Sequence, residues 1–427
     1  MTALATTSTA TRVEPKALWK PIGAALIGNT LEWFDLSIYA YFALTISQVF
    51  FPTADPTFSL LLAFATFGIS FLIRPLGAAV LGSYADRKGR KKALTLSILI
   101  MLTGTLLIAI MPSYATLGLA APIGILLARL LQGFSAGGEF GTSTAFMLEH
   151  APPRTRHFVA SLQFASQGFG VVIASTFGYF LTKHLDAQQM LDWGWRVPFF
   201  FGLLLGPVGL YIRRTVDESP DFKASEPGER PLREVLVTQK TLLLIAMGTL
   251  VVSTASNYMI QYMPSYAATS LNIAQSSGFL ATLTGGLILT IITPIVGYLS
   301  GHIGRLKIML AAAVVYAVAI LPAFFWLNSR PSASSLLVVA LMALIKAVYF
   351  APLPSLMADI FPVRTRVTGM SLSYNLGVTI FGGFAPVIAT GLIALTGSQL
   401  APSFYLMLAA ALSVVALLMA RKKLGMT

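Results

Sequence analysis

Twelve long apolar runs dominate this chain of 427 residues and limit what it can fold into. An α-helix needs roughly 20 apolar residues to cross the hydrocarbon core of a bilayer. The runs are continuous, whereas the strands of a membrane barrel alternate in polarity over about ten residues. The sequence therefore predicts an all-α membrane protein with twelve transmembrane helices. They are placed at 21–51, 57–82, 93–111, 117–145, 157–182, 195–213, 241–268, 276–300, 307–328, 334–357, 367–393 and 401–420.

The composition excludes several kinds of chemistry. Only 11% of the residues are charged, less than half the usual share of about 25% in a soluble chain. There is no cysteine, which rules out disulfides, thiolate metal sites and a cysteine nucleophile. The four histidines lack metal-binding spacing, and no nucleotide-binding P-loop is present. We therefore expect no enzyme activity, no metal, no cofactor and no use of ATP.

The net charge of +13 is distributed unevenly along the chain. With the amino terminus placed inside the cell, 23 of the 29 Lys and Arg residues fall in cytoplasmic segments. The outer segments hold three, namely Lys183, Arg196 and Arg330. Positive residues favour the cytoplasmic loops of membrane proteins. We interpret the charge as a topology signal, with both termini in the cytoplasm, and not as a surface for nucleic acid.

Two motifs recur after about half of the chain. Segment 82–92 aligns with 297–307 at an offset of 215 residues, and segment 149–156 aligns with 359–366 at an offset of 210. Both copies of each motif fall on the same side of the membrane, as expected of parallel repeats related by an axis along the membrane normal. The sequence thus predicts two related six-helix bundles.

The repeat divides the chain into five parts. The first residues are polar and lack the apolar stretch of a secretory signal. A charged segment with three prolines separates the two copies of the repeat. The predicted parts are a cytoplasmic tail at 1–20, a bundle at 21–213, a cytoplasmic linker at 214–240, a second bundle at 241–420 and a tail at 421–427.

Several motifs resemble those of the major facilitator superfamily. The stretch Gly82-x-x-x-Asp86-Arg87-x-Gly89-Arg90 resembles its loop between helices 2 and 3, and Arg129-x-x-Gln132-Gly133 resembles its fourth-helix motif. Further stretches around residues 28–35, 74–77, 129–139, 193–199 and 380–386 resemble its metabolite:proton symporters, a group that includes citrate, α-ketoglutarate, shikimate and proline/betaine carriers. The resemblance covers essentially the whole chain and implies two pseudo-symmetric bundles, alternating access and protons as the coupling ion.

The loop motif has a physical interpretation of its own. A carboxylate at Asp86 lies at a helix end, where it can accept backbone N–H bonds from a neighbouring helix start and pair with Arg90. We expect a latch that holds the two halves together, formed by Gly82, Asp86, Arg87, Gly89 and Arg90. The alternative is a basic turn that only sets topology. The second copy departs from the motif, because Gly301 and His302 stand where Asp86 and Arg87 stand in the first.

Six charged residues fall inside apolar runs, where ionisable groups are costly and mark functional pathways. Asn29, Glu32, Asp35 and Tyr39 are spaced to share one helix face. We expect Asp35 to pair with Arg129, as the resemblance also implies, and to carry the coupled proton. A static ion pair is the alternative. Glu32 and Glu139 are candidates for coupling or for helix packing, whereas Arg74 is interpreted as structural.

Lys346 gives the best indication of the solute. It is the one cation predicted inside the membrane in the second half, where no acid is predicted to neutralise it. Convergent donors with an unpaired cation suit a carboxylate. Alternatives are that Lys346 snorkels or pairs with Glu139, and that the glutamines only join helices. The candidate solute-binding residues are Lys346, Tyr39, Asn29, Gln163, Gln167, Tyr349, Asn257, Gln261 and Arg129.

These observations predict a proton symporter of the bacterial inner membrane. Its solute is a small organic anion, with citrate, tricarballylate or α-ketoglutarate as the leading class. An aromatic carboxylate or a betaine/proline-like zwitterion is the alternative, and a non-transporting membrane sensor is the alternative of another class. The expected partners are the anion, protons and lipid, without nucleic acid, and we expect a monomer.

Overall fold

The computed structural model describes residues 15–88, 90–215, 231–362 and 365–425, and there all regular structure is helical. The helices of the first half are α1 Pro15–Tyr41, α2 Ala43–Phe50, α3 Pro56–Leu72, α4 Arg74–Lys88, α5 Arg90–Ile110, α6 Tyr114–Leu117, α7 Ala120–Gly137, α8 Glu139–His150, η1 Pro153–Thr155, α9 Arg156–His184, α10 Ala187–Asp192, η2 Gly194–Arg196 and α11 Val197–Thr215. Those that follow are α13 Pro231–Val237, α14 Lys240–Thr269, α15 Gln275–Ile303, α16 Arg305–Ser329, α17 Pro331–Phe350, α18 Leu353–Ile360, α19 Arg366–Val378, η4 Thr379–Gly383, α20 Ala385–Thr396 and α21 Ala401–Leu424.

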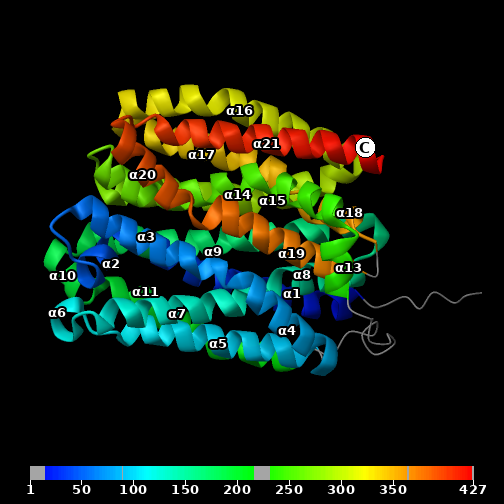
Figure 1. Cartoon of the computed structure of the whole chain (residues 1–427), viewed down its shortest axis with the longest axis horizontal. Helices are drawn as coiled ribbons and strands as arrows, with labels where there is room; N and C mark the ends of the chain where they lie inside the picture. Colours follow the sequence, from blue (N-terminus) through cyan, green and yellow to red (C-terminus); the bar gives the residue numbers. More distant parts are fainter. Residues whose placement is uncertain (1–14, 89, 216–230, 363–364, 426–427) are drawn as a thin grey trace, which may run out of the picture.

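The long helices run side by side along one direction, with α6 and α10 at one end of the bundle and α13 and α18 at the other (Figure 1). We refer to these ends as the α6 end and the α13 end. Nine of the described helical segments are long and apolar enough to cross a membrane, and Thr95–Ile110 is a shorter apolar helix. Their outer surface is apolar, as Val318 at 70% and Phe325 at 65% exposure illustrate. Such a surface suits lipid and not water.

The predicted halves lie on opposite sides of the molecule, the first in blue to green and the second in green to red (Figure 1). They meet most extensively along α9 and α15. Small residues allow this approach, because a Cβ on Gly168 would lie 2.8 Å from the Leu289 Cβ. Ser175 and Thr282 hydrogen-bond across the same seam at 3.0 Å. The second seam brings α3 and α4 against α19, η4 and α20.

The second seam contains the one π-helical turn among the described residues, Thr379–Gly383. The Thr379 hydroxyl donates to the Phe71 carbonyl at 2.8 Å, which joins the two halves. Added Cβ atoms on Gly68 and Gly382 would meet Phe384 and the Tyr258 ring at 2.7 Å. Glycine therefore permits close helix contact here, and π turns of this kind are frequent at functional sites.

Two of the sequence predictions concern residues that lie largely outside the described part of the structure. In the predicted linker, residues 216–230 lie outside the described part, and the following α13 is helical. Of the loop motif, Gly89 lies outside the described residues. The surroundings of Gly82 and the side chains of Asp86, Arg87 and Arg90 lie outside the description as well. The predicted latch and the predicted domain boundaries therefore stay predictions.

Candidate solute and proton site

Asp35 lies in the last third of α1 and is 5% exposed. Its carboxylate accepts a hydrogen bond from the Thr105 hydroxyl of α5 at 2.7 Å and another from the Gln132 amide of α7 at 2.5 Å. Two neutral donors from two other helices thus hold the acid that the sequence predicted to carry the proton.

Arg129 does not touch that carboxylate. Its guanidinium donates to Gln132 Oε1 at 2.7 Å and to the Ser70 hydroxyl at 3.1 Å, and it lies 4.6 Å from the centroid of the Tyr39 ring. The direct Asp35–Arg129 pair expected from the sequence is absent from the described ion pairs, and Gln132 bridges the two instead. Gln132 was not predicted as a site residue, although its place three residues after Arg129 puts both on one helix face.

The other intramembrane charges of the first half lie close by. Glu32 and Arg74 line the same small cavity as Asp35 and Arg129. Arg74 was interpreted as structural, yet its guanidinium carbon lies 4.2 Å above the Phe71 ring beside this charged group. Glu139 is buried at the start of α8. The structure therefore brings two acids and two bases together in one buried cluster.

Asn29 and Gln163 are joined to each other. The Asn29 amide donates to the Gln163 carbonyl at 2.8 Å, and the Gln163 amide donates to Asn29 Oδ1 at 3.0 Å. Ser143 and Ser166 complete the network. We expected these two residues to bind solute. In the structure their side-chain amides are instead engaged in hydrogen bonds that link α1, α8 and α9.

Two tyrosines predicted to bind solute donate hydrogen bonds to backbone carbonyls instead. Tyr39 donates to the Ala63 carbonyl at 3.3 Å, and Tyr349 donates to the Thr249 carbonyl at 2.7 Å. By contrast, Gln167, Gln261 and the Tyr258 hydroxyl are buried, and no hydrogen-bond partner is found for them among the described residues. Buried polar groups in proteins are normally paired. These three side chains are therefore candidates to receive a polar ligand.

Lys346 is buried in a pocket between α14, α16 and α17. Its ammonium donates to Asn257 Oδ1 at 2.5 Å and lies 4.8 Å from the centroid of the Phe350 ring. The described residues that line the pocket include no carboxylate. The contact between Asn257 and Lys346, both predicted site residues, was not anticipated from their positions in the sequence.

Aromatic pairs close this polar region towards both ends of the bundle. Phe140 stacks on Tyr374 with centroids 3.6 Å apart, and Phe164 stacks on Phe350 at 4.1 Å. Both pairs join the two halves, and we call these four residues the inner aromatic cluster because they lie towards the α13 end. Towards the α6 end, the halves meet through the rings Phe64–Tyr262, at 5.4 Å, and Tyr41–Phe279, at 5.6 Å.

The counterpart of the loop motif in the second half makes a defined contact. Arg305 pairs with Asp359 of α18 at 2.6 Å and donates to the Ser355 carbonyl at 2.9 Å. Gly304 precedes it with φ +103°, a conformation that favours glycine. The two recurring motifs of this half are thus linked to each other.

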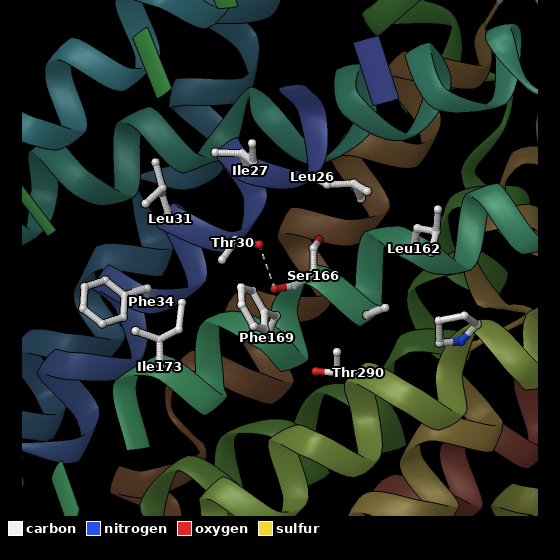
Figure 2. A pocket seen from close by; sticks show the side chains of 12 residues that line it. Leu26, Ile27, Thr30, Leu31, Phe34, Leu162, Ser166, Phe169, Ile173 and Thr290 are labelled. Atoms are coloured by element: carbon white, nitrogen blue, oxygen red, sulfur yellow. Dashed lines mark hydrogen bonds between the residues drawn. The ribbon is translucent and has the colours of Figure 1, made fainter. Parts of the chain in front are cut away.

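A larger cavity of about 450 Å³ lies outside the charged cluster. It is an apolar groove between α1, α9 and α15, with Phe34, Phe169 and Ile173 among its walls (Figure 2). Thr30 donates to the Ser166 carbonyl beside it. Phe169 is 49% exposed on the outer surface. The groove therefore faces the lipid side of the bundle and does not suit a charged solute.

Comparison with known proteins agrees with this architecture. The family model described as "Sugar (and other) transporter" matches residues 22–238 and 223–422. The citrate-proton symporter of Salmonella typhi is 38% identical over 93% of both chains. The proline/betaine transporter of Escherichia coli (strain K12) is 33% identical over 95% of this chain and 84% of that protein.

Solved structures share the fold. A crystal structure of a D-xylose-proton symporter has a TM-score of 0.75 and 18% identity, covering 94% of this chain and 96% of that chain. The major facilitator superfamily proton:xylose symporter XylE, bound to 6-bromo-6-deoxy-D-glucose, has a TM-score of 0.77 and 18% identity, with 96% of each chain covered.

Proposed function

The chain belongs to the major facilitator superfamily, and on that premise we propose that it imports a small carboxylate anion together with protons. It is a multi-pass membrane transporter and not an enzyme. The predicted twelve-helix, all-α fold is confirmed. Citrate, tricarballylate and α-ketoglutarate form the leading class of solutes.

One observation carries the choice of an anion. Lys346 lies buried against an amide oxygen and an aromatic ring, without a carboxylate in the described lining of its pocket. A buried cation lacking a counter-charge is unfavourable, and a carboxylate ligand would supply that charge. The unpaired groups of Gln167, Gln261 and Tyr258 offer further hydrogen bonds to the same polyanion.

Proton coupling is assigned to the Asp35 cluster. The Gln132 bridge leaves the Asp35 carboxylate close to Arg129 without fixing the two together. Movement of α7 relative to α1 would change how strongly the guanidinium stabilises the ionised acid, because the interaction of buried charges depends steeply on distance. We place the proton on Asp35, with Glu32 and Glu139 as the secondary candidates.

The proposed transport cycle follows from the aromatic contacts at the two ends of the bundle. On the basis of the aromatic contacts towards both ends, we assign the structure to an occluded state. Opening of the Phe64–Tyr262 contact would admit solute from one side, and separation of the inner aromatic cluster would release it on the other. The distribution of Lys and Arg supports placing the α13 end and both termini in the cytoplasm. The protein would act as a monomer in the inner membrane.

A second candidate solute is a betaine-like zwitterion. The Tyr258 ring contacts Phe71 at 5.2 Å, Phe67 at 5.9 Å and Trp33 at 6.2 Å. Clustered aromatic faces bind quaternary ammonium groups. The Escherichia coli relative, a proline/betaine transporter, agrees with this alternative.

Proteoliposome uptake distinguishes the two candidates. We expect labelled citrate or tricarballylate to accumulate when the outside is more acidic than the lumen, and to stop accumulating when a protonophore collapses the gradient. Glycine betaine and proline are measured in parallel with empty liposomes as the control. Accumulation of betaine without accumulation of either carboxylate would contradict the anion assignment and favour the second candidate.

A further inference from the structure

Each half buries an ionisable side chain between three corresponding helices. Asp35 lies among α1, α5 and α7, and Lys346 lies among α14, α16 and α17. The two repeats have thus placed an acid and a base between corresponding helices, the acid on α1 and the base on α17. They differ in their surroundings. Gln132 links Asp35 to Arg129, whereas the Lys346 ammonium contacts the Asn257 oxygen and the Phe350 ring.

The neighbours of Lys346 can be named helix by helix. From α14 come Ser253, Ser256 and the neutral amide of Asn257, and from α16 comes Tyr316. From α17 comes Tyr349, whose hydroxyl is engaged by the Thr249 carbonyl. The titratable neighbours in the described pocket are therefore the two phenols, which are uncharged at neutral pH.

An ammonium in such a pocket lacks compensation. Moving a charge from water into a protein interior costs several kcal/mol when no counter-charge accompanies it. The neutral amine avoids most of that cost while keeping one N–H to donate to Asn257. A carboxylate that arrives beside Lys346 reverses this preference, because its negative charge stabilises the ammonium form over the neutral amine.

We infer that Lys346 binds a proton together with the solute anion and releases both together, which makes it a second proton-coupling residue. The amine lone pair accepts a proton from a water molecule on the side from which the anion comes. One O–H bond breaks, one N–H bond forms, and the hydroxide passes to the solvent on that side. When the anion leaves on the other side, that N–H bond breaks and the proton follows. This inference rests on the proposed anion transport, and it adds a proton that is separate from the one on Asp35.

The first test counts protons taken up on binding. Citrate and tricarballylate are titrated calorimetrically into the full-length protein at about pH 8, well above the usual carboxyl range. Two buffers of different ionisation enthalpy then give the number of protons absorbed per anion. We expect Lys346→Arg, which keeps a permanent cation, to absorb up to one proton fewer than the native protein. Asp35→Asn should retain the Lys346 proton.

The matched control is Lys183→Arg, which makes the same exchange at an exposed lysine on α9. It should absorb as many protons as the native protein. Equal proton uptake by native protein and Lys346→Arg would overturn the inference while leaving anion transport intact.

The second test needs no solute. A lysine in the unfolded chain keeps its proton to about pH 10. If the empty folded protein holds Lys346 neutral, the unfolded state binds more protons, and stability rises with pH. We expect the Tm of the native protein to rise more steeply between about pH 6 and pH 9 than that of Lys346→Met. Equal slopes would overturn the inference. A steeper native slope without binding of citrate or tricarballylate would support a neutral Lys346 in the empty protein and would contradict the proposed solute class.

Discussion

Asp35 and Arg129 are linked by a side-chain amide and not by contact. Gln132 donates to the Asp35 carboxylate at 2.5 Å and accepts from the Arg129 guanidinium at 2.7 Å. An amide with one donor and one acceptor end can join an acid to a base only in this orientation. The acid–base pair is therefore coupled through a third residue whose position depends on α7.

We predict that Gln132→Met weakens both stability and coupling. Methionine preserves the length of the side chain but leaves the carboxylate without one donor and the guanidinium without one acceptor. Loss of a partner for buried polar groups costs about 1–3 kcal/mol. Thermal unfolding and pH-driven uptake measure the two effects. Gln188→Met, at an exposed glutamine of α10, is the matched control. A variant that matches the native protein in both assays would refute the bridging role.

Asp35→Asn should strongly reduce accumulation driven by a pH gradient while preserving solute exchange, because only the proton carried by Lys346 then remains coupled to the solute. Asparagine has nearly the same shape and still accepts a bond from Thr105, but it carries no titratable proton. Counterflow and gradient-driven uptake in the same proteoliposomes separate the two activities. Uphill accumulation at the native level would show that Asp35 is not the coupling residue.

Lys346→Ala should weaken carboxylate binding by about 2–5 kcal/mol, because the anion loses its buried counter-charge. Lys346→Arg should rescue only part of this loss, since the planar guanidinium needs a different geometry from the ammonium. Calorimetry at fixed pH measures both variants. Affinities within about threefold of the native value, roughly 0.6 kcal/mol, would remove Lys346 from the binding site.

The inner aromatic cluster should control access from the α13 end. Since the chain contains no cysteine, Gln167→Cys provides a single reactive thiol in the buried polar region. We predict that adding Tyr374→Ala, which removes the ring stacked on Phe140, speeds its labelling by a membrane-impermeant thiol reagent applied from that end. Gln167→Cys alone is the control. Equal labelling rates would show that access is closed elsewhere.

The α9–α15 seam should not tolerate larger residues. A Cβ on Gly168 would lie 2.8 Å from the Leu289 Cβ and the Thr290 backbone nitrogen. Gly168→Ala should therefore destabilise the protein by about 1–3 kcal/mol through overpacking. At Gly391 an added Cβ has no described neighbour within 4 Å. Gly391→Ala should leave the Tm unchanged or raise it, and an equal effect of the two substitutions would refute close packing at Gly168.

The sequence by itself determined the membrane class, the all-α fold and the family. Apolar runs of bilayer length leave helices as the structure that satisfies the backbone, and short motifs are local enough to be recognised along the chain. It also identified members of the charged cluster, because Asp35, Glu32 and Arg129 each stand out against apolar neighbours, as Lys346 does in the second half.

Only the tertiary structure decided which of these side chains meet. Asn29 with Gln163, Lys346 with Asn257, and Asp35 with Gln132 are separated by 134, 89 and 97 residues. Helical spacing defines the face of the helix on which a residue lies. Which other helix contacts that face depends on how the helices pack. Gln132, with no charge to distinguish it, became visible as the link between Asp35 and Arg129 only when α1, α5 and α7 came together.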